Sequence, residues 1–227
     1  MKSRSVVSLL VCLTAMVFGA VAQDKTIDDF TTGAYQSPSY KNGSHQSIQA
    51  GSMIGGSRVT GMSICDTTVK GQCAAFNPYS QASSYGFFPA KGSRVASMVQ
   101  TAGYYASPRI DMGYGFQAAM DENFGAYQKI RINFSGLSQP LNFNILLFTG
   151  TAHAQGGCNM PAYPGSFSAE LPLSLFIVQS QTFDFAHVTA ADVIFQSSST
   201  IGNVSFGVTS IELTNTTKSG IVIDCHY

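Results

Sequence analysis

Charge, helical periodicity and long apolar runs are all scarce in this sequence. Charged residues make up 11% of the 227 residues, with twelve basic and twelve acidic side chains. A chain so balanced offers no basic surface for a phosphate backbone, so nucleic acid is not an expected partner. After the first 22 residues no apolar run reaches the ~18 residues typical of a transmembrane helix, so no transmembrane anchor is expected.

The one notable apolar run lies at the start of the chain. Lys2 and Arg4 precede the apolar stretch Val6–Phe18, and Ala20 and Ala22 occupy the two positions that direct cleavage. This pattern predicts a signal peptide over residues 1–22 and therefore a secreted or periplasmic protein. The leader takes two of the twelve basic residues and no acidic ones, so the net charge of the mature chain is −2.

Cysteine is also infrequent, but the count is informative. Cys12 leaves with the signal peptide, and Cys65, Cys73, Cys158 and Cys225 remain. An even number in an oxidising compartment predicts two disulfides, chosen among three pairings. The short separation favours Cys65 with Cys73, which would leave Cys158 to join Cys225. The seven-residue spacing of the first pair is not that of a zinc knuckle, and no histidine clusters near it.

Period-two alternation dominates the mature chain, and this is the signature of β-strands. In Gln128–Phe134, for example, isoleucine and phenylalanine point one way while lysine, arginine and asparagine point the other. Ten to thirteen short strands separated by Gly, Asn, Pro and Ser turns predict an all-β fold, a two-sheet antiparallel β-sandwich of the jelly-roll type. Neither an internal repeat nor a linker is found, so residues 23–227 are expected to form one domain.

Local features are predicted as well. Ser47–Ile54 and Arg58–Cys65 are expected to form a hairpin around a Gly-Gly turn, and the apolar phase shifts near Thr209 as a β-bulge would produce. Phe116–Met120 is a candidate strand. One helical turn is considered near Ala118–Asn123, where a strand fits equally well.

Several short motifs together resemble the galactose-binding-like jelly-roll domain of exported bacterial proteins and carbohydrate-binding modules. They are the opening Asp28-Asp29-Phe30, the turn Gly55-Gly56-Ser57-Arg58, and two closing stretches, Phe183–Phe195 and Phe206–Leu213. The resemblance implies a β-sandwich that often binds glycans, and it does not imply catalysis. The chain departs from the pattern in having no tryptophan, the residue that commonly stacks on a pyranose, so tyrosine would have to serve.

The candidate ligand-binding residues are tyrosines and an arginine between glycines. Tyrosine rings suit stacking on sugars, and an arginine can donate paired hydrogen bonds to hydroxyls or a carboxylate. The residues in question are Tyr104, Tyr105, Arg109 and Tyr114. The alternative is that the adjacent tyrosines place one ring in the core and one at its edge.

A structural calcium ion is considered for three acidic residues. Jelly rolls often bring the first and last strands side by side, which would place Asp28 and Asp29 near Glu212 and supply the oxygen ligands that Ca²⁺ prefers. Alternatively, Asp29 caps a turn and Asp28 is solvated. No other cofactor is expected.

Motifs for catalysis are missing. The sequence contains neither G-x-S-x-G nor H-E-x-x-H. The adjacent acids Asp121 and Glu122 would point to opposite faces of a strand, whereas glycoside hydrolysis needs two carboxyls that converge on one bond. The chain is therefore not expected to be an enzyme.

The sequence thus predicts a secreted, non-enzymatic binding module for carbohydrate or another extracellular polymer. The alternative is a structural or adhesive surface protein that acts by protein–protein contacts, which low charge and many small polar residues would suit. An exported hydrolase ranks third, and clustered acids in the structure would bring it forward.

Overall fold

The computed structural model describes residues 23–33, 35–36, 43–64, 84–89, 96–101, 109–196 and 206–225. The predicted signal peptide lies outside these residues, as do Tyr104, Tyr105, Cys65 and Cys73. The helical segments within them are short 3₁₀ turns, and none could cross a membrane.

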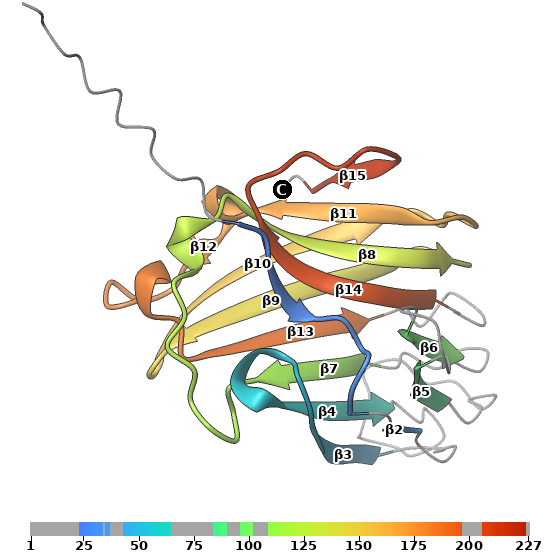
Figure 1. Ribbon diagram of the computed structural model, residues 1–227, viewed down its shortest axis with the longest axis horizontal. Coiled ribbons are helices and arrows are strands. Elements are labelled where there is room, and N and C mark those ends of the chain that lie inside the picture. Colours follow the sequence, from blue (N-terminus) through green and yellow to red (C-terminus); the bar gives the residue numbers. More distant parts are fainter. Residues whose placement is uncertain are drawn as a thin grey trace, which may run out of the picture.

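One layer of the molecule is a five-stranded sheet (Figure 1). Its order is β1 (Lys25–Asp28), β14 (Phe206–Thr214), β8 (Lys129–Leu137), β11 (Phe167–Pro172) and β15 (Val222–Asp224). Neighbours are antiparallel except β11 and β15, which run parallel. The described chain therefore begins and ends on the two opposite edges of this sheet.

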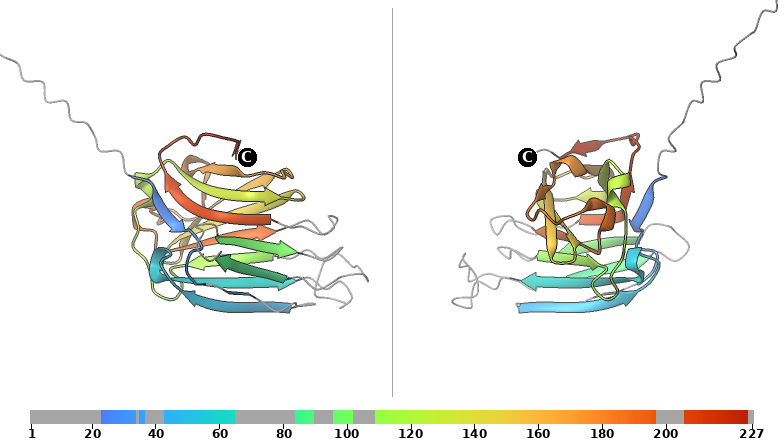
Figure 2. Two further views of the ribbon diagram at one scale, coloured as in Figure 1. Left: turned by 45° about the vertical axis from the view of Figure 1, so that its right-hand side comes forward. Right: turned by 90° about the vertical axis from the view of Figure 1, so that its left-hand side faces the viewer.

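The other layer is a seven-stranded antiparallel sheet. Its order is β12 (Ile177–Val178), β10 (Ala152–Met160), β9 (Leu141–Thr149), β13 (Ala190–Gln196), β7 (Arg109–Tyr114), β4 (Ser57–Ile64) and β3 (Gly43–Ala50). A small third sheet joins β2 (Tyr35–Gln36), β5 (Ser84–Pro89) and β6 (Ala96–Thr101). Figure 2 shows the layers from two further sides.

The apolar faces of the two large sheets form one core. On β8 the alternation seen in the sequence buries Ile130, Ile132 and Phe134 in the same cluster as Phe143 of β9. The Phe134 ring stacks on Phe167 with centroids 4.7 Å apart. The predicted all-β, two-sheet sandwich of the jelly-roll type is confirmed, with the third sheet as an addition.

The local predictions have mixed outcomes. The hairpin is confirmed, because β3 pairs with β4 around the 3₁₀ turn η1 (Ile54–Gly56). The β-bulge is confirmed by register shifts between Gly207 and Ser210. The strand Phe116–Met120 is wrong: a left-handed Gly115 with φ of +80° ends β7, and the chain continues in bends. No helical turn forms over Ala118–Asn123.

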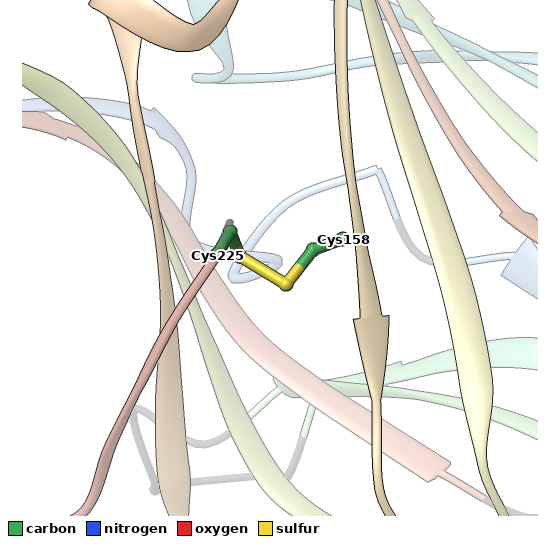
Figure 3. The surroundings of a disulfide bond; sticks show 2 residues. All are labelled: Cys158 and Cys225. Carbon is green, nitrogen blue, oxygen red and sulfur yellow. A yellow bond between two sulfur atoms is a disulfide. The ribbon is translucent and has the colours of Figure 1, made fainter. Parts of the chain in front are cut away.

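A disulfide joins Cys158 to Cys225, as predicted (Figure 3). The two Cα atoms are 5.2 Å apart, and both side chains are buried. Cys158 lies on β10 of the seven-stranded sheet, whereas Cys225 follows β15 of the five-stranded sheet. The bond therefore links the two layers of the sandwich.

Candidate functional site

Two of the motifs that suggested the family resemblance, the opening segment and the Gly-Gly turn, meet in the core. Arg58 Nη1 donates to Asp28 Oδ2 at 2.6 Å, and the hydroxyl of Tyr114 donates to the same oxygen at 3.0 Å. Arg58 and Asp28 are 0% and 1% exposed. Burial raises the pKa of the Asp28 carboxyl, and the guanidinium of Arg58 opposes that rise. The motifs thus hold the opening turn against the seven-stranded sheet.

The hydrogen bond to Asp28 holds Tyr114 in the core. Its ring is 0% exposed, with the hydroxyl turned toward Asp28. A ring in this position is not available to stack on a sugar at the surface. Among the predicted ligand-binding residues that the structure describes, Tyr114 is in the core and Arg109 is at the surface.

The three acids considered for calcium are not brought together. The first strand does lie beside β14, with Thr26 opposite Glu212. Asp28, however, faces the core, while Asp29 accepts hydrogen bonds from the backbone and hydroxyl of Thr31 as a turn cap. Glu212 accepts from Asn133 and Ser210. Over the described ranges, no group of three His, Cys, Asp or Glu side chains could hold a metal ion.

A groove of about 270 Å³ opens on the outer face of the seven-stranded sheet, the face turned away from the core. Strands β3, β4, β7 and β13 supply most of its lining, and the bend after β7 supplies the rest. The lining residues are Gln46, Val59, Gly61, Arg109, Asp111, Gly113, Phe116, Gln117 and Asp192. Arg109, one of the predicted ligand-binding residues, therefore lines this groove.

Alternation along β7 explains why these side chains share one face. Ile110 and Met112 are fully buried, so Arg109, Asp111 and Gly113 point outward. The register then places Asp192 of β13 directly opposite Gly113. Asp192 is therefore diagonal to Asp111, within reach of a shared ligand.

The charged side chains of the groove lie close together. Arg109 Nε donates to Asp111 Oδ1 at 2.6 Å. Burial raises the pKa of Asp111, which this contact opposes. Burial also raises the pKa of Asp192 to about 6, and the nearby charge of Asp111 adds to the effect while Arg109 counters it. One carboxyl of the groove therefore titrates in mildly acidic solution.

An exposed aromatic ring completes the groove. Phe116 is 50% exposed, and its ring lies so close over Gly113 that a Cβ there would come within 2.7 Å of it. Phe116 meets Phe148 edge-on with ring centroids 5.7 Å apart, and Phe148 contacts His153 in turn. The backbone of Gly113 thus forms a floor for an apolar ring beside the charged groups.

Beyond the groove, the same face continues as a row of amides. The register aligns Asn159 of β10, Asn142 of β9 and Gln196 of β13 with Arg109 of β7. These three amide side chains are exposed. Four strands about 4.8 Å apart give this polar row a length of about 14 Å.

Sequence reasoning missed Asp111, Asp192 and Phe116. The alternation from Arg109 to Tyr114 was a usable signal, since it places Arg109 and Asp111 on one face. Nothing in the sequence showed that β13 would pair with β7, so Asp192 could not be placed. The sequence predicts a strand at Phe116, whereas the residue lies in a bend with its ring at the surface.

Two further features lie outside the groove. Asp121 contacts His187 at 3.0 Å, and Glu122 forms an ion pair with Lys25, so the adjacent acids have separate partners. A second hollow, of about 480 Å³, lies at the ends of β8 and β14 near Tyr163. Its described lining includes no charged side chain.

Comparisons with known proteins give low similarity. No protein-family model matches the chain, and no curated protein sequence matches it. Among solved structures, the chain is similar to the family 11 carbohydrate-binding module of the cellulosomal cellulase Lic26A-Cel5E of Clostridium thermocellum. The TM-score is 0.45 at 15% identity, over 87% of this chain and 97% of that chain.

Two further structures are similar at lower scores. A family 11 carbohydrate-binding module from Clostridium thermocellum, in complex with a beta-1,3-1,4-mixed-linked tetrasaccharide, has a TM-score of 0.42 at 13% identity over 85% of this chain and 95% of that chain. A family 43 arabinoxylan arabinofuranohydrolase from Bacillus subtilis has a TM-score of 0.32 at 10% identity, over 77% of this chain and 41% of that chain. Similarity at this level assigns no ligand.

Proposed function

We propose that the outer face of the seven-stranded sheet binds carbohydrate, with the groove as the centre of the site. The observation that carries this proposal is the exposed ring of Phe116 beside the Arg109–Asp111 pair and Asp192. Ligand sites typically combine an apolar surface with a few convergent polar groups. The expected ligand is an extracellular glycan.

Each groove residue has a distinct task in this proposal. Phe116 offers an apolar face for the C–H side of a sugar ring, the task that tryptophan commonly performs. The guanidinium of Arg109 donates hydrogen bonds to hydroxyl oxygens, while Asp111 and Asp192 accept from hydroxyls. Charge-assisted hydrogen bonds of this kind are stronger than those between neutral groups.

The amide row favours a glycan chain over a single sugar. Asn142, Asn159 and Gln196 continue the polar surface for about 14 Å from Arg109 across neighbouring strands. Amides donate and accept, so they can pair with hydroxyls in either orientation. Affinity is therefore expected to increase with the length of the oligosaccharide.

The test is binding to a panel of neutral polysaccharides by affinity electrophoresis, followed by calorimetry with oligosaccharides. Phe116→Ala and Arg109→Ala are each expected to weaken binding at least tenfold. Ile221→Ala is the matched control, since Ile221 is 48% exposed but lies outside the groove. Flat results across the panel, or equal binding by wild type and both groove variants, would contradict the proposal.

Tyr104 and Tyr105 remain predicted ligand-binding residues. They precede Arg109 by five and four positions in the sequence, respectively. The same panel tests them: Tyr104→Ala and Tyr105→Ala should each weaken binding if these rings stack on the glycan. Binding equal to wild type in both variants would remove them from the site.

Glycoside hydrolysis is a second candidate, because two carboxyls with raised pKa share the groove. An acid that titrates near pH 6 could donate a proton to a glycosidic oxygen. Release of reducing ends from the polysaccharides that bind, lost in Asp192→Asn, would support it. Binding without release of reducing ends would contradict hydrolysis and support the binding function.

We also propose that the protein is exported and cleaved after Ala22 or Gln23, which the N-terminal sequence of the mature protein tests. An N-terminus at Gln23 or Asp24 is the expected result. The cross-sheet disulfide suits an oxidising compartment. The adhesive alternative predicts self-association or retention on cell-surface material, which sizing at high concentration and cell fractionation would detect.

A further inference from the structure

We propose that the groove selects neutral glycans over anionic ones at neutral pH, and that protonation of Asp192 relaxes this selection in acid. The inference rests on the proposed carbohydrate binding and names the substrate class and the regulation of that site. It comes from the arrangement of charges in the groove.

The groove holds one cation and two carboxyls. Arg109 makes its ion pair with Asp111 at 2.6 Å. Asp192 stands on the next strand, opposite Gly113 and diagonal to Asp111. With both carboxyls ionised, the three side chains carry a net charge of −1, and a uronate or sulfate placed among them would be repelled.

No other described residue that lines the groove is charged. β3 and β4 supply glutamine, valine and glycine, and the bend after β7 supplies phenylalanine and glutamine. Toward β9, Asp192 faces Leu146, with the amide Asn144 diagonal to it. The one titratable side chain on β10 is His153, which contacts Phe148. Asp111 and Asp192 therefore determine how the charge of the groove varies with pH.

Protonation changes the chemistry of the site in two ways. Burial and the charge of Asp111 raise the pKa of Asp192 to about 6, so the carboxyl is ionised at pH 7.5 and mostly protonated at pH 5. The protonated acid removes one negative charge, and it becomes a donor where it was only an acceptor. A carboxylate on the ligand could then accept a hydrogen bond from Asp192.

The experiment compares probes that share a backbone. Soluble cellulose, mannan and galactan derivatives are each used as the neutral polymer and as the C6-oxidised uronate, at pH 7.5 and pH 5.0. Wild type should prefer the neutral form about tenfold at pH 7.5 and about threefold or less at pH 5.0. Asp192→Asn should show the lower preference at both pH values.

The matched control is Asp224→Asn, an exposed aspartate on β15 of the other sheet, which should behave as wild type. The inference is overturned if the preference of wild type for the neutral polymer is the same at both pH values. It is also overturned if Asp192→Asn prefers the neutral polymer at pH 7.5 as strongly as wild type does. Either of these two outcomes would overturn the inference without contradicting the proposed carbohydrate binding. Failure of all six polymers to bind at either pH would instead overturn the proposed function and the inference together.

Discussion

At the scale of single residues, the Asp28–Arg58 pair shows how a ligand-like motif can be structural. Both side chains are buried, and Arg58 also lies over the ring of Phe30, 5.3 Å from its centroid. The backbone N–H of Phe30 donates to Asp28 Oδ1 at 2.8 Å, which holds Phe30 in its left-handed conformation with φ of +56°. The motif residues thus position the turn after β1.

Removing one member of this pair should be costly. Arg58→Met would leave the buried carboxylate without its cation, and the free energy of unfolding should fall by about 3–5 kcal/mol. Arg109→Met is the control, since the Arg109–Asp111 pair lies at the surface, with 45% of the Arg109 side chain exposed, and should contribute less than about 1 kcal/mol. Urea denaturation measures both variants. Equal effects of the two substitutions would contradict the structural role of Arg58.

Asp192 should make stability depend on pH. Its pKa is raised to about 6 in the folded protein, whereas an unfolded aspartate titrates near 3.8. The folded state therefore binds the proton more tightly, and stability decreases as the pH rises through the interval between these values. After allowance for solvent screening, Asp192→Asn should be more stable than wild type by about 1–2 kcal/mol at pH 7.5.

The difference should approach zero near pH 4, where Asp192 is protonated in the folded state. Thermal or urea unfolding of both proteins across pH 4–8 measures it. A constant difference at all pH values would mean that Asp192 does not titrate in this interval.

At the scale of elements, two glycines on neighbouring strands offer a comparison. A Cβ on Gly113 would meet the Phe116 ring at 2.7 Å, whereas a Cβ on Gly61 would lie 3.4 Å from Asp111, an ordinary contact. Gly113→Ala should displace the ring and weaken glycan binding more than Gly61→Ala does, because a methyl at Gly61 fits beside Asp111 without moving the ring. Calorimetry measures both variants. Equal affinities would show that the position of the ring is unimportant.

The elements also show how far sequence reasoning extends. The strand at Gln128–Phe134 was predictable because its alternation is complete, and the β3–β4 hairpin because two glycines mark its turn. The bend after β7 was not predictable, because its apolar residues suggest a further strand. In the structure Gly115 ends β7 and the chain turns away. The partner of Asp192 is set by long-range pairing of β13 with β7, which no local pattern encodes.

At the scale of the whole molecule, the Cys158–Cys225 disulfide links the two sheets across a sequence separation of 67 residues. By the chain-entropy model, a loop of this length contributes about 4 kcal/mol by restricting the unfolded chain. Replacing both cysteines by serine should lower the free energy of unfolding by about that amount. Chemical denaturation measures this change, and a loss below about 1 kcal/mol would contradict the model for this bond.

The positions of the chain ends have a consequence for tethering. β1 and β15 occupy the two edges of the five-stranded sheet, while the groove opens on the far side of the other sheet. A neighbouring domain, a cell-wall linkage or a laboratory tag fused at either end of the described chain would attach to the sheet opposite the groove. The molecule could thus be immobilised from either end with its proposed binding face directed outward.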